Sequence, residues 1–106
     1  MNRRARLANR RASVTFAFSC NDLKYLATIS RYDDGQLAEI FISNAKVGSH
    51  SDAAAKDAAI VCSIALQYGV PVEVIRKALL RDSGGVASSP LGCAIDHIIA
   101  ADGDMP

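Results

Sequence analysis

Residues 43–52, SNAKVGSHSD, combine side chains that could bind an anion. They stand between a stretch typical of a strand, LAEIFI, and an apolar stretch typical of a helix. Free backbone N–H groups at a helix start, the positive end of the helix dipole and a lysine can together hold a phosphate or carboxylate. The candidate ligand-binding residues are Lys46, Gly48, Ser49, His50 and Ser51. The segment is neither a P-loop nor a dinucleotide fingerprint, and the same residues also make an ordinary capped turn.

The sequence predicts no catalytic residue. His50, Ser51 and Asp52 are of the types found in hydrolytic triads, but residues adjacent in sequence rarely face one substrate, and no nucleophile elbow is present. His97 and Asp96 are expected to form an exposed pair on a helix. The acids are scattered, with neither an EF-hand loop nor a His-x-x-x-His pair, so we predict no metal site.

The three cysteines, Cys20, Cys62 and Cys93, are widely spaced and form no CxxC pair. This spacing indicates neither a zinc site nor a disulfide framework. Cys62 lies in the most apolar predicted helix, where we expect a small buried side chain.

The first twelve residues contain five arginines and no acid: Arg3, Arg4, Arg6, Arg10 and Arg11. The net charge of the whole chain is +1. Without these five arginines, seven of the 12 Lys and Arg residues remain against 11 Asp and Glu residues, which gives the rest of the chain a net charge of −4. We interpret residues 1–12 as a flexible basic arm, which could contact nucleic acid or an acidic partner, or could simply be a solvated terminus.

The rest of the chain predicts an α+β domain, a three-stranded antiparallel meander packed against two or three C-terminal helices. Alternating apolar residues favour strands over 13–20, 24–32 and 36–43, with turns at NDL and DDG. The alternation of apolar and polar residues shifts by one position between Leu37 and Ile40, which indicates a bulge or a later strand start. Helices are expected near 51–68, from Pro71, and from Ser89-Pro90. We assign 13–101 to a single domain and 102–106 to a tail.

The order of these features resembles the TSCPD domain, the small module at the C-terminus of adenosylcobalamin-dependent ribonucleotide reductases that also occurs as a free-standing protein. The segments that carry the resemblance are DDGQLAEIFIS, NAKVGSHSD and SIALQYGVPVEVIRKAL. It spans roughly residues 13–82. The motif that names the family is altered, because SSPLGCAID has its proline before its cysteine.

The resemblance implies an accessory or regulatory module of deoxyribonucleotide synthesis that has no turnover of its own. Related full-length reductases use adenosylcobalamin, but their barrel and cofactor cleft exceed what 106 residues can house. The chain alone is therefore expected to bind no cofactor, and whether to call it an enzyme stays open. A reductase large chain is the expected partner.

Two alternatives remain: a nucleic-acid-binding protein that uses the arginine arm, and a nucleotide or anion sensor that uses the turn at 46–52. Nucleic acid is the weaker candidate. Exposed strand edges could also pair in a homodimer. No uninterrupted apolar run reaches the length of a membrane span, and no signal segment follows the basic N-terminus, so we expect a cytoplasmic protein without a membrane partner.

Overall fold

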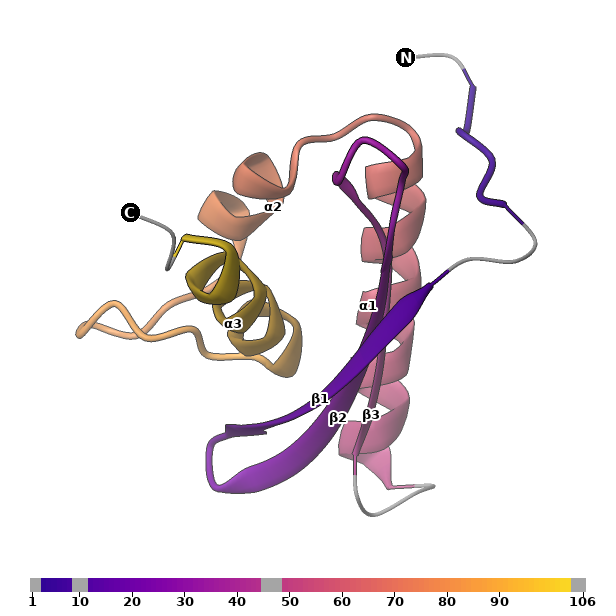
Figure 1. Ribbon diagram of the computed structural model, residues 1–106. Helices are drawn as coiled ribbons and strands as arrows, with labels where there is room; N and C mark the ends of the chain where they lie inside the picture. The colour runs from indigo at the N-terminus through magenta and orange to yellow at the C-terminus, as the bar shows by residue number, and fades with distance from the viewer. Residues whose placement is uncertain (1–2, 9–11, 45–48, 104–106) are drawn as a thin grey trace.

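A computed structural model describes residues 3–8, 12–44 and 49–103. The described chain forms three strands and then three helices (Figure 1). Their bounds are β1 Ser13–Cys20, β2 Leu23–Arg31, β3 Leu37–Asn44, α1 His50–Gln67, α2 Val72–Ala78 and α3 Pro90–Gly103. The predicted α+β fold with a meander followed by helices is confirmed.

The sheet has the order β1-β2-β3, and both strand pairs are antiparallel. Asn21 and Asp22 form the first turn with φ values of 51° and 65°, a left-handed conformation that these two residue types tolerate. Ser30 pairs with Glu39 but Arg31 pairs with Leu37, so Ala38 is the extra residue of a bulge. This bulge is the one that the shifted alternation between Leu37 and Ile40 indicates.

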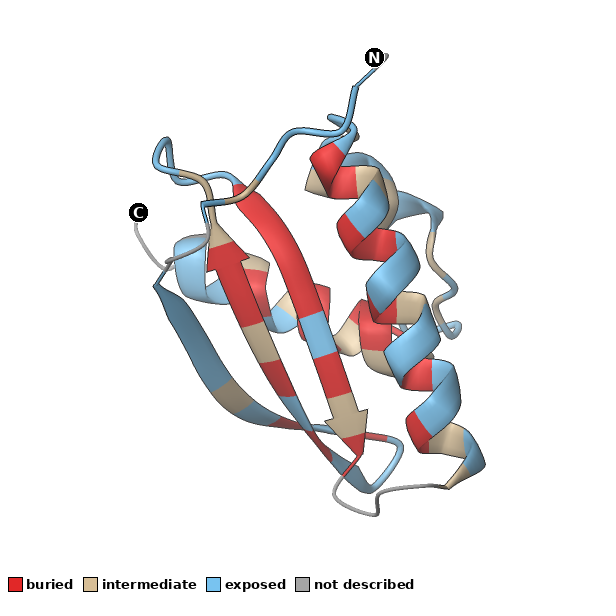
Figure 2. Ribbon diagram, turned by 90° about the vertical axis from the view of Figure 1, so that its right-hand side faces the viewer, coloured by how far each residue is buried: buried red, intermediate tan, exposed pale blue. Residues whose placement is uncertain are grey.

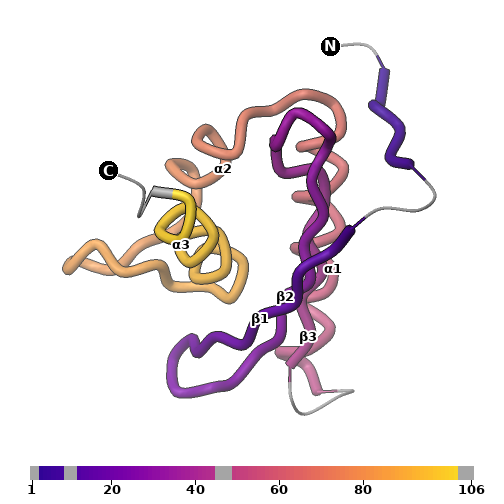
Figure 3. The backbone as a smooth tube through the Cα atoms, in the orientation of Figure 1, coloured from indigo at the N-terminus to yellow at the C-terminus, as the bar shows by residue number. Residues whose placement is uncertain are grey.

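Helix α1 lies beside β3 in the plane of the sheet, whereas α2 and α3 lie behind the sheet (Figure 2). Ile95 and Ile98 of α3 join Ile40 of β3 and Ala55 and Ala59 of α1 in the buried core. Helix α3 continues through Asp102 and Gly103, which the sequence assigned to a tail. Its last turn is held by Asp102, whose carboxylate accepts two hydrogen bonds of 3.1 Å from Arg31. The tube view shows the chain between α2 and α3 extending away from the sheet (Figure 3).

The polar stripe of α1 faces the free edge of β3. Ser63 Oγ accepts a hydrogen bond from Ile40 N at 2.8 Å and donates one to Ile40 O at 3.0 Å. Gln67 Nε2 donates to Ala38 O at 3.1 Å. Asp52 Oδ1 accepts from the N–H of Asn44, the last residue of β3, at 2.9 Å. These side chains satisfy strand groups that another strand would otherwise bind, and so the helix covers an edge that could aggregate.

None of the described helices covers the other face of the sheet (Figure 2). Leu26 of β2 and Phe41 of β3 lie on it, and each is 48% exposed. Ile60 of α1 is equally exposed and lines the same shallow depression of about 270 Å³. In the part of the chain that the structure describes, these three residues form an open apolar patch on this face.

We predict that Ser63→Ala destabilises the protein by about 2 kcal/mol, because both the N–H and the C=O of Ile40 then lose a partner in a buried site. Urea unfolding followed by circular dichroism measures this loss. The matched control is Ser83→Ala in the exposed loop before α3, which should change the free energy of unfolding by less than about 0.5 kcal/mol. Equal effects of the two substitutions would contradict a role for the serine at the strand edge.

Candidate functional site

The strand-to-helix junction contains the described part of the predicted anion site. Ser49 is the N-cap of α1, and its Oγ accepts a hydrogen bond from Asp52 N at 3.1 Å. Ser51 Oγ accepts from Asn44 Nδ2 at 3.0 Å and lies 3.2 Å from Ser49 Oγ. His50 is exposed at the first position of the helix. Lys46 and Gly48 lie outside the described residues, so anion binding at this turn stays a prediction.

The negative charge at this helix start belongs to the protein itself. Asp52 is 2% exposed, and its carboxylate bonds to the end of β3 and pairs with Lys56 at 3.0 Å. A carboxylate at this position satisfies the positive end of the helix dipole. Ser51 and Asp52 are thus directed at β3 and Lys56 rather than at His50. The described part of the junction fastens α1 to the sheet.

Part of the basic N-terminal segment is bound to the domain. Arg4 Nε donates to Gln67 Oε1 at 2.5 Å, and Ala5 N donates to Gln67 O at 2.7 Å. Tyr32 Oη donates to Ala5 O at 3.2 Å. Gln67 therefore joins the N-terminal segment, the end of α1 and the edge of β3. The structure places Arg4 in a structural contact.

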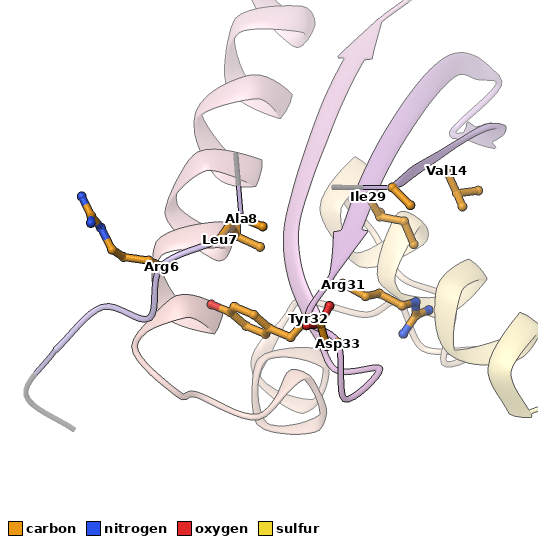
Figure 4. Close-up of a pocket in the computed structure, with 9 residues that line it drawn as sticks. Arg6, Leu7, Ala8, Val14, Ile29, Arg31, Tyr32 and Asp33 are labelled. Carbon is orange, nitrogen blue, oxygen red and sulfur yellow. The ribbon is translucent and has the colours of Figure 1, made fainter. Parts of the chain in front are cut away.

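The other arginines of the segment divide into two groups. Arg3 and Arg6 are exposed, whereas Arg10 and Arg11 lie outside the described residues. Arg6 borders a surface depression of about 580 Å³ between the N-terminal segment and the sheet. Figure 4 shows its side chain extending away from that depression, while Tyr32 extends toward the N-terminal segment. A role of these arginines in binding nucleic acid or a partner stays a prediction.

Two cysteines that the sequence separates lie side by side. Cys20 Sγ at the end of β1 is 2.9 Å from Cys93 Sγ in the first turn of α3. Burial, together with the neighbouring Cys93, raises the pKa of the Cys20 thiol to about 12. Cys62 is buried in α1 as expected, and burial raises its pKa to about 11. Sequence analysis missed the pair because 73 residues separate its members and the only signal was the presence of a cysteine in each element.

Asp96 of α3 is held by two arginines. Arg81 binds it through two hydrogen bonds of 2.7 Å, and Arg76 Nε donates to it at 3.0 Å. These bonds, that of Arg81 first, hold the pKa of the Asp96 carboxyl below its ordinary value. The predicted pairing with His97 is wrong, because His97 instead stacks on Phe16 of β1 with ring centres 4.5 Å apart. Asp96 thus fastens α2 and the following loop to α3.

Among the described residues, no group of three or more His, Cys, Asp or Glu side chains could hold a metal ion. None of the helices in the described ranges has the length and apolar character needed to cross a membrane.

Comparison with known proteins identifies the family. The model of the TSCPD domain matches residues 3–101, so this chain belongs to the TSCPD domain family. The match begins within the segment that the sequence assigned to an arm, and the division into arm and domain stays a prediction. No solved structure matches the chain.

Curated relatives of the chain are vitamin B12-dependent ribonucleotide reductases. The protein from Rhodopirellula baltica is 41% identical over 73 residues, which cover 69% of this chain and 7% of the relative. That from Agrobacterium fabrum is 37% identical over 70 residues, which cover 66% of this chain and 6% of the relative. That from Bradyrhizobium diazoefficiens is 36% identical over 73 residues. The chain is therefore homologous to a small region of these reductases and spans less than a tenth of their length.

We predict that Asp96→Asn lowers the free energy of unfolding at pH 7 by about 1–2 kcal/mol, because Arg76 and Arg81 lose their shared charged partner. The pKa of Asp96 is lowered in the folded state, so its contribution is present above the unfolded value of about 3.9 and is lost as the pH falls through the folded value. Urea unfolding at several pH values should therefore show the wild type and the variant converging in acid. Asp57→Asn, at an exposed position of α1, is the matched control. A difference between wild type and Asp96→Asn that persists undiminished at the acid end would contradict the charge pairing.

Proposed function

We propose that this protein is an accessory or regulatory module of ribonucleotide reduction that binds a reductase large chain and has no turnover of its own. The observation that carries this proposal is the homology of about two thirds of the chain to a region of vitamin B12-dependent ribonucleotide reductases. The reduction chemistry of those relatives is not assigned to this chain, because more than nine tenths of each relative lies outside the match. Adenosylcobalamin would be bound by the partner chain and not by this protein.

Two apolar surfaces of the described chain support a binding role. One is the open sheet face around Leu26 and Phe41. The other is a groove of about 560 Å³ between α1 and α2, in which Val61 is 67% and Val74 57% exposed. Exposed apolar patches rimmed by polar residues are typical of surfaces that bind other proteins.

The junction and the N-terminal arginines support this proposal more than they support the alternatives. The described bonds of Ser49, Ser51 and Arg4 go to the protein itself, and these residues hold α1 and the N-terminal segment in place. Their described role is to build the domain. A nucleotide or nucleic acid would have to bind through the remaining residues, Lys46, Gly48, His50 and the other arginines.

The test is titration of the purified protein into a purified vitamin B12-dependent reductase large chain from the same cells, with the heat of binding as readout. We expect a complex with a Kd in the range of about 1 μM or tighter, typical of a specific protein–protein interface. Val61→Glu and Leu26→Glu place a charge in the groove and on the open face, and at least one of them should weaken binding by about tenfold or more. Ser83→Glu, at an exposed position of the loop before α3 that lines neither surface, is the control.

Absence of a complex with the reductase chain would contradict the proposal. Binding to nucleic acid that weakens steeply with salt and is lost with residues 1–12 would then favour the arginine arm. An increase in melting temperature with nucleotide that Lys46→Ala abolishes would favour the turn as a ligand sensor.

A further inference from the structure

The Cys20–Cys93 pair lies where two elements from opposite ends of the chain meet. Cys20 is the last residue of β1 and is 4% exposed, whereas Cys93 is half-buried in the first turn of α3. Their sulfur atoms are 2.9 Å apart. A disulfide bond needs about 2.05 Å, so the sulfurs would have to approach by less than about 1 Å.

Contacts other than those of the two thiols hold this geometry. Asn21 Nδ2, directly after Cys20, donates to Ser88 O at 3.2 Å and joins the β1–β2 turn to the loop before α3. Ser89 fixes the first turn of α3, because its Oγ accepts from Gly92 N and its C=O accepts from Cys93 N at 2.9 Å. These contacts hold both cysteines in place without a bond between the sulfurs, so forming that bond requires little movement.

The loop before α3 also approaches the helix closely at the cysteine. A Cβ atom at Gly92 would lie 3.0 Å from Ala87 Cβ, so only glycine allows this packing without a shift. Cys93 Sγ lies 3.5 Å from Ala87 O on the same side. The loop thus forms one wall of the site, and the partial exposure of Cys93 leaves a route for a small molecule.

The two thiols differ in access. Cys93 is reachable from solvent, whereas Cys20 is almost fully buried and its raised pKa keeps it protonated at neutral pH. In thiol–disulfide exchange the accessible thiol reacts first with an external disulfide and the buried one completes the reaction. This difference assigns the order of the two steps.

We propose that Cys20 and Cys93 form a reversible thiol–disulfide exchange site whose substrates are small disulfides such as glutathione disulfide. Cys93 loses its proton to solvent, and its sulfur attacks one sulfur of the substrate R–S–S–R, forming a mixed disulfide and releasing R–S⁻. Cys20 then loses its proton and attacks Cys93 Sγ, which releases the second R–S⁻ and forms the Cys20–Cys93 bond. The protein loses two electrons and two protons, and the substrate becomes two R–SH. Two thiols of a reduced substrate reverse the reaction.

The oxidised protein has a covalent link between the end of β1 and the start of α3. The linked residues are 73 positions apart, so the bond restricts the unfolded chain strongly. We expect oxidation to raise the melting temperature by about 10 °C or more. The site would thus change the rigidity of the contact between α3 and the sheet.

The experiment equilibrates the full chain in buffers of differing ratios of reduced to oxidised glutathione, quenches with acid, unfolds the protein and alkylates the remaining thiols. Intact mass then counts the labels. We expect three labels in the reduced protein and one in the oxidised monomer, with peptide mapping placing that label on Cys62. Three labels in every buffer, a bond that includes Cys62, or a bond between two chains would overturn the proposal.

Variants test the order of the steps. Cys20→Ala should accumulate a glutathione adduct on Cys93, because the second thiol is missing. Cys93→Ala should remain unmodified, because Cys20 is buried. Cys62→Ala is the matched control and should still form the Cys20–Cys93 bond. Adduct formation in Cys93→Ala instead of Cys20→Ala would overturn the assigned order, and circular dichroism confirms that each variant is folded.

Discussion

The hydrogen bonds between the polar stripe of α1 and the free edge of β3 are the interaction on which the rest of the structure depends. A three-stranded sheet alone is marginal in water, and its outer strands expose unpaired backbone groups. Asp52, Ser63 and Gln67 bind such groups at Asn44, Ile40 and Ala38. The helix takes the place of a fourth strand, and its small apolar residues then enter the core beside the sheet.

The spacings of helix and strand fit each other. From Asp52 to Gln67 the helix rises about 22 Å, and from Asn44 to Ala38 the strand spans about 20 Å. The two elements run in opposite directions, so polar residues on one helical stripe meet alternate residues of the strand. A buried polar side chain costs little only when it finds such partners, and here each one does.

The same contacts give several of the candidate site residues a structural role, whatever else they bind. The junction residues Ser49, Ser51 and Asp52 bond to the start of α1 and the end of β3, and Arg4 bonds to Gln67 at the end of α1. This arrangement leaves two apolar patches open: the one around Leu26 and Phe41 on the sheet face, and the groove between α1 and α2. The proposed function would place a reductase chain on one of these surfaces.

The sequence by itself determined the fold class, the order of elements and the family. Alternation of apolar residues, the turn residues at 21–22 and 33–35, the glycine after α1 and the proline at the start of α3 are local signals, and local backbone preferences decide them. The shift in the alternation of apolar and polar residues before Ile40 even located the bulge, because a bulge changes which face each side chain occupies.

Only the tertiary structure decided which distant residues meet. Cys20 and Cys93, Asp96 and its two arginines, and Phe16 and His97 are joined by the packing of α3 against β1 and α2. Likewise, the periodicity of α1 defines a polar stripe but cannot say whether it faces water or a strand edge. Periodicity reports the direction of side chains about one element, whereas pairing across elements depends on how the whole chain packs.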